Sequence, residues 1–313
     1  MNIRIRTSLV ILIFILALSS IITSCSTNDK IVIGRDIENY PYIPRGNGFS
    51  FGFVSDDLNR TVEERIFNIK HNEDLELNIM IANGKELAMD LMVLPIIDFA
   101  PREVIINNKK QDRIMFNLEA QKASIVPVKL SNLEKGRHDI IFLIIKDPNN
   151  HDINEEYRKS TELNHVVGLR LSVIVDEEKI PEHQIVEGTT LENKVLQGIF
   201  LSKKDELTRW LIEDLEGTNN IQYKIQVGNT SESELPYAII ALKDWVPIKF
   251  DGKYAIFGSV SPNKRNIYTE NLDVQNVTKV SNFTTILIPK PFQLYNRLNS
   301  MDIEPSLRLA LVK

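Results

Sequence analysis

The chain has 313 residues, of which 43% are hydrophobic and 25% charged, with one cysteine and a formal net charge of −5. This composition is that of a globular protein, and the length predicts two domains rather than one. The mildly acidic balance of mixed charges argues against a nucleic-acid partner, and one cysteine excludes an intrachain disulfide.

The amino terminus has the pattern of an export signal. Arg4 and Arg6 precede the uncharged run SLVILIFILALSSII at 8–22. A basic start followed by an apolar centre of roughly 7–15 residues is typical of a secretory signal peptide. The run is shorter than the about 20 apolar residues that a membrane-spanning helix needs.

The residues that end this run, Ile22-Thr23-Ser24-Cys25, resemble the lipobox of bacterial lipoproteins. The resemblance implies that the Cys25 sulfur carries a diacylglycerol and that cleavage before it removes 1–24 as the signal peptide. Residues 25–44 would be the lipidated amino terminus and tether, since two acyl chains anchor a protein stably. The protein would be exported and held at the cell membrane or outer membrane, facing outside the cytoplasm. An ordinary secretory signal and an uncleaved signal anchor are the alternatives.

Two later stretches share one pattern. Residues 75–99 read LELNIMIANGKELAMDLMVLPIIDF and residues 221–245 read IQYKIQVGNTSESELPYAIIALKDW. Both alternate apolar and mostly polar residues, break at an asparagine, resume as an apolar run and end in an acid–aromatic pair. Alternation is typical of a strand with one buried face, and the breaks supply turn residues. Each copy therefore predicts two antiparallel strands, and the match predicts a duplication.

The duplication carries specific expectations. Leu77, Ile79, Tyr223 and Ile225 should face the cores of two separate domains, which would unfold in two transitions. Further strands follow both copies, ending in the strong apolar runs DIIFLIIKDP at 139–148 and NFTTILIPKP at 282–291.

Many short strands without βα alternation predict an all-β fold of two tandem sandwiches. The pattern resembles immunoglobulin-like β-sandwich domains of bacterial surface proteins, which implies sandwiches at 45–174 and 195–313. The polar segment 175–194 is the predicted linker. One short helix is predicted near 203–216, capped by Ser202 and ended by Gly217.

No catalytic motif is present. The sequence lacks G-x-S-x-G, H-E-x-x-H, a P-loop and G-x-G-x-x-G, and a lipid-bound Cys25 leaves no thiol for catalysis. The five histidines lie in polar stretches and are predicted to be solvated loop residues. His138 and Asp139 are adjacent on a strand, so they point to opposite faces and should not form a dyad.

The richest oxygen cluster is DPNNHDINEE at 147–156. Asp147, Asn149 and Asp152 are weak calcium candidates, because hard cations prefer oxygen ligands from such loops. The spacing does not match an EF-hand, and a hydrophilic loop is the main alternative, so no metal or other cofactor is predicted. Trp245, which takes the place of Phe99 in the repeat, is expected to serve a core.

These observations favour a non-catalytic, membrane-anchored surface lipoprotein. Its sandwiches would bind or scaffold another envelope protein or a wall polymer, although the binding residues are unknown. The alternative is a solute-binding lipoprotein of a transporter, but the chain lacks the βα alternation of such proteins. An enzyme with an unrecognised site is the third hypothesis.

Overall fold

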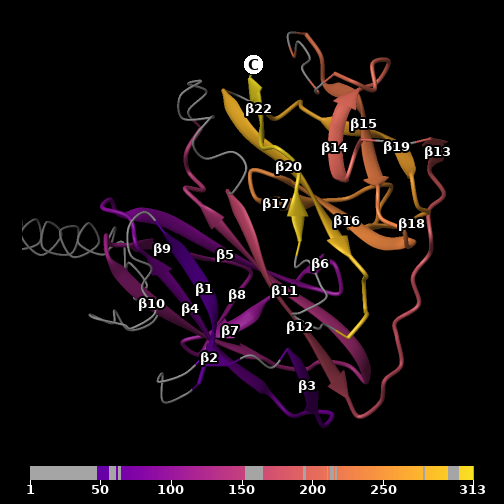
Figure 1. Cartoon of the computed structure of the whole chain (residues 1–313). Coiled ribbons are helices and arrows are strands. Elements are labelled where there is room, and N and C mark those ends of the chain that lie inside the picture. Colours follow the sequence, from indigo (N-terminus) through magenta and orange to yellow (C-terminus); the bar gives the residue numbers. More distant parts are fainter. Residues whose placement is uncertain are drawn as a thin grey trace, which may run out of the picture. The chain divides into compact units, whose positions relative to one another are not determined.

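The computed structural model describes residues 48–55, 61–62, 65–151, 165–192, 195–209, 211, 215, 217–277, 279–294 and 303–312. These residues form β-strands, bends and turns, arranged as four sheets that make two β-sandwiches (Figure 1). The predicted fold class, an all-β protein with two immunoglobulin-like sandwiches, is therefore confirmed.

The first sandwich has two sheets around one core. Its first sheet has the order β2 (Thr61–Val62), β1 (Phe49–Val54), β4 (Leu75–Asn83), β10 (Lys122–Leu130), β7 (Val104–Ile106), β8 (Lys109–Gln111). Its second sheet has the order β3 (Ile66–Ile69), β12 (Val166–Val175), β11 (Gly136–Lys146), β5 (Met89–Ile97), β6 (Ala100–Pro101), with β9 (Ile114–Leu118) also on β5. Alternate residues of both sheets fill the space between them with buried Ile, Leu, Val and Phe.

The second sandwich repeats this plan. One sheet has the order β13 (Thr189–Glu192), β19 (Lys264–Asp273), β15 (Asn220–Asn229), β14 (Gly198–Lys203). The other has the order β17 (Val246–Ile248), β16 (Leu235–Lys243), β20 (Val280–Pro289), β21 (Glu304–Pro305), with β18 (Ile256–Val260) on β16 and β22 (Leu309–Val312) on β20. Its core also contains Tyr223, Tyr237 and Tyr268.

The strand order identifies both sandwiches as immunoglobulin-like. In each, the first, second and fifth main strands share one sheet: β1, β4 and β10, and then β14, β15 and β19. The third, sixth and seventh share the other sheet: β5, β11 and β12, and then β16, β20 and β22. This is the Greek-key order of the immunoglobulin fold. Segments 75–99 and 221–245 therefore occupy the same places in the two sandwiches, as the predicted duplication requires.

The asparagine of each repeat has the same buried role. The Asn83 side chain donates from Nδ2 to the Leu87 carbonyl at 2.9 Å, and its Oδ1 accepts the Lys85 N–H at 3.0 Å. Asn229 donates to the Ser233 carbonyl at 2.8 Å and accepts the Ser231 N–H at 2.9 Å. Such side-chain bonds to the local backbone satisfy a turn that would otherwise leave buried polar groups unpaired.

The acid–aromatic pairs form two-residue hairpin turns. Asp98 and Phe99 have φ of 51° and 65°, and Asp244 and Trp245 have φ of 47° and 63°. Two successive positive φ values define a type I′ turn, which suits the twist of a hairpin. An aromatic residue rarely adopts this conformation, so its cost must be offset by the burial of Phe99 and Trp245.

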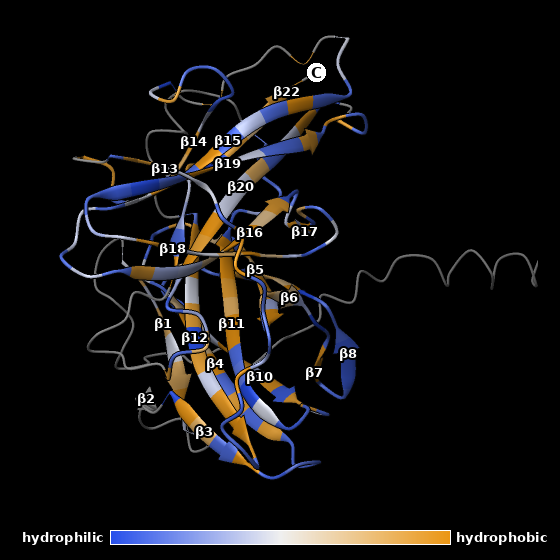
Figure 2. Ribbon diagram, turned by 90° about the vertical axis from the view of Figure 1, so that its right-hand side faces the viewer, coloured by the Kyte–Doolittle hydropathy of each residue, from blue (hydrophilic) through white to orange (hydrophobic). Residues whose placement is uncertain are grey.

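Each sandwich has its own core, as the sequence predicts, but a third buried cluster, which the sequence analysis did not predict, lies between the two sandwiches. On β11, Ile140 and Phe142 face the first core, while Ile141 and Leu143 belong to a third buried cluster. The same alternation holds on β5, β16 and β20, and Figure 2 shows β11 and β16 coloured largely as apolar. The outer faces of the two facing sheets thus pack against each other, because these strands are apolar on both sides.

The helix expected near 203–216 is not present in the described part of that segment. Lys203 ends β14, and 204–209 form bends and a turn, while 210, 212–214 and 216 lie outside the described residues. The chain folds back on β14, since the Leu211 N–H donates to the Leu201 carbonyl and the Lys203 N–H to the Arg209 carbonyl. Leu211 and Leu215 still enter the second core, so packing overrode the helical spacing.

The segment predicted as a linker, 175–194, makes its own contacts with the second sandwich. The Val186 N–H donates to the Phe257 carbonyl at 2.8 Å, and β13 pairs with β19. Residues 193 and 194 lie outside the described residues.

Candidate functional site

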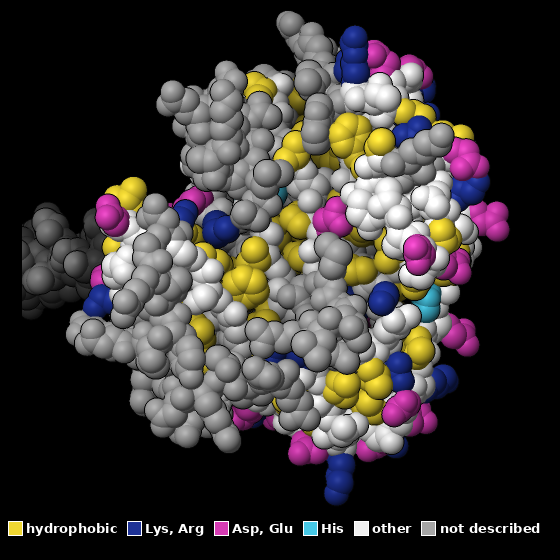
Figure 3. Space-filling view, viewed as in Figure 1, with side chains coloured by type: hydrophobic (Ala, Val, Ile, Leu, Met, Phe, Trp, Pro, Cys, Tyr) yellow, Lys and Arg dark blue, Asp and Glu magenta, His cyan; other side chains and the backbone are white. Residues whose placement is uncertain are grey.

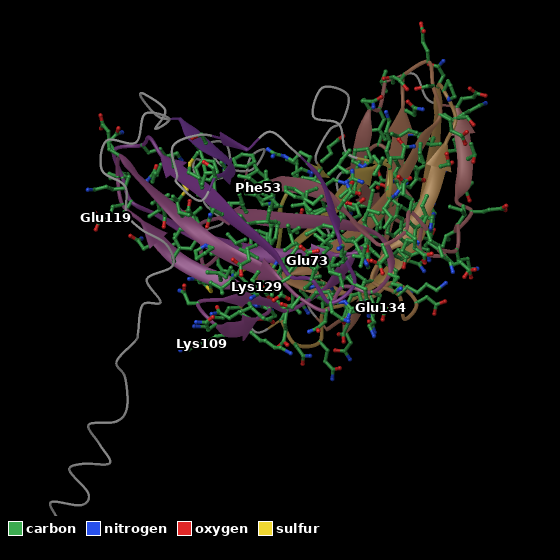
Figure 4. The ribbon with its side chains drawn as sticks, turned by 90° about the horizontal axis from the view of Figure 1, so that it is seen from below. Phe53, Glu73, Lys109, Glu119, Lys129 and Glu134 are labelled. Atoms are coloured by element: carbon green, nitrogen blue, oxygen red, sulfur yellow. The ribbon has the colours of Figure 1, made fainter. Side chains whose placement is uncertain are left out.

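A cavity of about 290 Å³ opens at one end of the first sandwich. It lies where the end of β5, the β6–β7 connection, β8, the end of β10 and the start of β11 meet. Its lining residues are Ile97, Asp98, Arg102, Glu103, Val104, Ile105, Lys110, Lys129, Ser131, Asn132, Leu133, Glu134 and His138. Lys129 and Glu134 are labelled in Figure 4, both on the lower side of the view. The cavity combines an apolar floor with a charged rim.

The rim carries charges of both signs. Arg102 and Lys110 are exposed and make no ion pair with a described residue. Lys129 is shared between Asp74, at 2.9 Å, and Glu76, at 3.2 Å. The hydrogen bonds that join them raise the pKa of Lys129 and lower that of Asp74. As far as the described residues show, Arg102 and Lys110 are thus available to a ligand at the mouth of the cavity.

His138 is the buried polar centre of this site. Its Nδ1 lies 2.7 Å from Asp98 Oδ2, and its Nε2 lies 2.8 Å from the Glu134 carbonyl oxygen. Both ring nitrogens face acceptors, and only the imidazolium can donate from both. Burial lowers the pKa of His138, but the Asp98 carboxylate and the Glu134 carbonyl outweigh it and raise the pKa overall.

In this geometry neither ring nitrogen of His138 is free to act as a general base. Ser131 and His138 line the same cavity, and Asp98 orients the ring, so the residue types of a catalytic triad are present. A general base needs a nitrogen lone pair aimed at the nucleophile, however, and the Glu134 carbonyl occupies Nε2. The His138 side chain instead links the β5–β6 turn, through Asp98, to the loop before β11, through the Glu134 carbonyl.

The partner of His138 is Asp98, 40 residues away in the sequence. Asp139 instead pairs with Arg170, so the sequence-based rejection of a His138–Asp139 dyad is confirmed. The prediction that all five histidines are solvated was wrong for two of them. His138 is 7% exposed because it lies on β11, and His165, in the bend before β12, is 1% exposed and lies beside the ring of Trp245.

A second buried polar group, the Arg170–Asp139 ion pair, connects the two sandwiches. Arg170 on β12 and Asp139 on β11 are 2% and 1% exposed and form a two-point ion pair. Arg170 also donates to the carbonyls of Pro289, at 2.5 Å, and Lys290, at 2.9 Å. Asp139 accepts the Phe292 N–H at 3.0 Å. Burial raises the pKa of Asp139 and the guanidinium opposes this change.

Trp245 lies at the opposite end of the interface between the sandwiches. Its Nε1 donates to the Pro148 carbonyl at 2.7 Å, and its ring lies 5.8 Å from that of His165. Phe99, its counterpart in the repeat, packs edge-on against Phe257 and Phe292. The expected core role of Trp245 is thus correct, but the core is the one between the sandwiches.

The calcium candidates fall in the loop that meets Trp245. Asp147 is half-buried, and burial raises its pKa, with the cation of Lys85 opposing the change. Asn149 is exposed, and Asp152 lies outside the described residues. Within the described ranges, no three His, Cys, Asp or Glu side chains converge on one point. The loop contacts the second sandwich through the carbonyls of Pro148 and Asn150, which accept from Trp245 and Asn282, while the Asp147 N–H bonds the Asp90 carbonyl within the first sandwich.

The predicted lipid anchor cannot be placed on this structure. Cys25, the signal peptide and the tether lie outside the described residues. In the part of the chain that is described, no helix is long and apolar enough to span a membrane. On the face seen in Figure 3, the described Lys, Arg, Asp and Glu side chains are scattered and form no large area of one sign.

No protein-family model and no curated protein matches the chain. Among solved structures, it is similar to the CARDB domain of a Pyrococcus furiosus protein, solved in complex with di-metal ions. The identity is 13% and the TM-score 0.25, covering 41% of this chain and 94% of that one.

It is also similar to the Escherichia coli chaperone DraB, with 9% identity and a TM-score of 0.25 over 86% of this chain and 99% of that chain. The SafA pilin of Salmonella enterica in complex with the SafB chaperone matches at 11% identity and a TM-score of 0.24, over 84% and 96%. At these scores the similarities support no inference, and the immunoglobulin-like assignment rests on the strand order.

Proposed function

We propose that the chain is a non-catalytic, membrane-anchored surface lipoprotein that binds or scaffolds another protein or an envelope polymer. The observation that carries this proposal is the third buried cluster, which joins the two sandwiches through the outer faces of β5, β11, β16 and β20. Two modules joined by a continuous apolar core keep their surfaces in a fixed relation, as a scaffold requires. Domains meant to move have smaller, more polar interfaces.

The polar groups of the interface support the same reading. Arg170 donates to backbone carbonyls of the second sandwich, and Trp245 donates to a backbone carbonyl of the first. Each sandwich thus inserts a buried donor into the other. Buried donors that lose their acceptors are costly, so separation of the sandwiches is strongly opposed.

The non-catalytic part of the proposal rests on His138. The only histidine in the described cavity has both nitrogens engaged by acceptors, so it has no lone pair to serve as a base. The proposal predicts that the purified protein binds a wall polymer or an envelope protein without cleaving it. Sedimentation with isolated cell wall, before and after protease treatment, would separate the two partner classes, and release of soluble fragments would contradict the proposal.

The anchor is tested by labelling. Cells that express the full chain and are fed a fatty-acid analogue should incorporate it into the protein, because the sequence predicts an acylated Cys25. Cys25→Ala should abolish the label and leave the precursor unprocessed, while the neighbouring Ser26→Ala should label normally. A Cys25→Ala protein that is labelled and processed would contradict the lipoprotein assignment.

A second candidate is a solute-binding lipoprotein of a transporter, and the cavity beside His138 is the observation that favours it. Its mixed rim, with Arg102 and Lys110 unpaired in the described residues, suits a small solute with a carboxylate. A thermal-shift screen of amino acids and short carboxylic acids tests this role. Under it, a hit should be lost in Arg102→Ala and Lys110→Ala but not in Lys109→Ala, which is outside the cavity.

A further inference from the structure

The two sandwiches differ at the edge of one sheet. In the first, the seventh main strand, β12, is covered on its outer edge by β3, which pairs with Ser172–Val175 in parallel. Backbone hydrogen bonds run from the Ser172 N–H to the Arg65 carbonyl at 2.7 Å and from the Asp176 N–H to the Ile69 carbonyl at 3.1 Å. This edge is therefore paired, and its backbone groups are satisfied.

The registers show which residues of the second sandwich correspond to this edge. Asp139 on β11 is opposite Ser172, and Asn282 on β20 is opposite Ala310. Asp139 and Asn282 are equivalent, because each accepts the backbone N–H of the hairpin aspartate of its own repeat, Asp98 or Asp244. Each also donates its own N–H to the carboxylate of that aspartate. Ser172, Val173 and Ile174 thus correspond to Ala310, Leu311 and Val312.

At the equivalent edge of β22 the structure describes no pairing strand. β22 pairs only with β20 among the described residues. The described part of the segment after β14, the counterpart of the one that supplies β3, folds back on β14 through the Leu211 N–H and the Leu201 carbonyl. No described strand pairs with the outer N–H and C=O groups of Leu309–Val312, and a strand edge of this kind can accept another strand.

Side-chain burial shows the same difference. Val173 and Leu311 both face their cores and are 0% and 5% exposed. Ile174 is 7% exposed, whereas its equivalent Val312 is 46% exposed. The two repeats share the strand framework, and within the described ranges only the first has a covering strand beside it.

We propose that the β22 edge, Leu309–Val312, is a docking site for an extended segment of a partner protein, added as a parallel strand. This inference rests on the proposed binding function and names its site. The occupant should resemble β3, with apolar residues at alternate positions that reach the sandwich interior, as Phe67 and Ile69 do.

A second copy of the chain fits the edge less well. Two β22 edges related by a twofold axis would pair antiparallel, whereas the first sandwich takes its edge strand in parallel. Strand addition supplies main-chain hydrogen bonds from the new strand, and alternate side-chain pockets give it specificity.

The probe is a synthetic peptide with the sequence of residues 64–71, ERIFNIKH, which contains the strand that covers the equivalent edge. Amide hydrogen exchange of 309–312 should slow at least tenfold when the peptide saturates the full chain in detergent. Exchange at Ser172–Val175, whose edge is already paired, should not change. A control peptide with Asn68→Pro, which removes one backbone donor, should protect less.

Orientation is the discriminating measurement. In a Cys25→Ser, Val312→Cys chain, a spin label at position 312 should be nearer to a label on the carboxyl end of the peptide than to one on its amino end. No protection at millimolar peptide, protection elsewhere, antiparallel binding, or dimerisation through β22 would each overturn the proposal. If wall or envelope binding persists while 309–312 gain no protection, the edge assignment fails alone. If no envelope component binds, the proposed function fails.

Discussion

The two sandwiches share a framework but differ in what has been built on it. Both keep the buried asparagine, the type I′ hairpin aspartate and the same strand order. The first adds the Asp98–His138 tie, the Arg170–Asp139 pair and the covering strand β3. The second has Ser281 and Asn282 at the positions of His138 and Asp139. The elements that both sandwiches share thus specify the fold, and the buried charged groups are additions found in the first sandwich.

The largest expected effect is at Asp139. Asp139→Ala leaves the Arg170 guanidinium buried without its carboxylate, and removing one partner of a buried ion pair costs about 3–5 kcal/mol. The equivalent change in the second sandwich, Asn282→Ala, removes only neutral hydrogen bonds and should cost about 1 kcal/mol. Urea unfolding would measure both.

A double variant sharpens this comparison. Replacing both partners, Asp139→Leu with Arg170→Met, removes the stranded charge and should recover most of the lost stability. Equal losses for Asp139→Ala and Asn282→Ala would contradict the view that the first copy alone depends on a buried charge.

The next largest loss of stability is expected for substitutions in the third buried cluster, between the sandwiches. Leu143 is fully buried between the sandwiches, so Leu143→Ala should cost about 2–5 kcal/mol through lost burial and a cavity. Because the cluster belongs to both sandwiches, unfolding should be one transition. The only tryptophans are Trp210 and Trp245, so tryptophan emission reports on the second sandwich and, through Trp245, on the interface.

The matched control is Ile79→Ala, which lies in the core of the first sandwich alone and should cost a similar amount. It should shift the tryptophan transition as much as it shifts the far-ultraviolet signal. Two separated transitions would show that the sandwiches unfold independently and that the third cluster is too weak to couple them.

The buried asparagines test whether the repeats remain equivalent. Asn83→Ala and Asn229→Ala each leave turn backbone groups unpaired and should each cost about 1–3 kcal/mol. The outward positions Asn78 and Lys224 are controls, where alanine should cost about 0.5 kcal/mol or less. A large loss at only one asparagine would show that the shared turn carries stability in one copy alone.

Most of the strand framework could be predicted from sequence because it is local. Alternation, turn residues and the repeated acid–aromatic pair placed β4, β5, β15 and β16 correctly. The third cluster was missed although its signal was present. The runs 139–146 and 237–243 are apolar without alternation, and in antiparallel strands this indicates burial on both faces.

The polar centres could not be found in one sequence. His138 meets Asp98, and Asp139 meets Arg170, across 40 and 31 residues, and only folding brings them together. Arg170 gave a partial signal as the single charge in the run VVGLRLSVIV, since a charge in a buried strand must have a partner. The helix prediction failed because the spacing of Leu211 and Leu215 also fits a chain folded back onto the core.

The smallest effect is the pH dependence that His138 gives the first sandwich. Its pKa in the folded state lies above the 6.5 of the free side chain, so folding takes up protons where the two values differ. The stabilisation is complete below about pH 6.5 and declines as pH rises through the folded-state pKa. The urea concentration at the midpoint of unfolding should therefore decrease as the pH is raised through that range. His138→Gln should lower stability at pH 6 and lose this part of the slope, while Ser281→Ala, at the equivalent position, should leave the slope unchanged. A wild-type slope equal to that of His138→Gln would mean that His138 stays neutral despite its two acceptors.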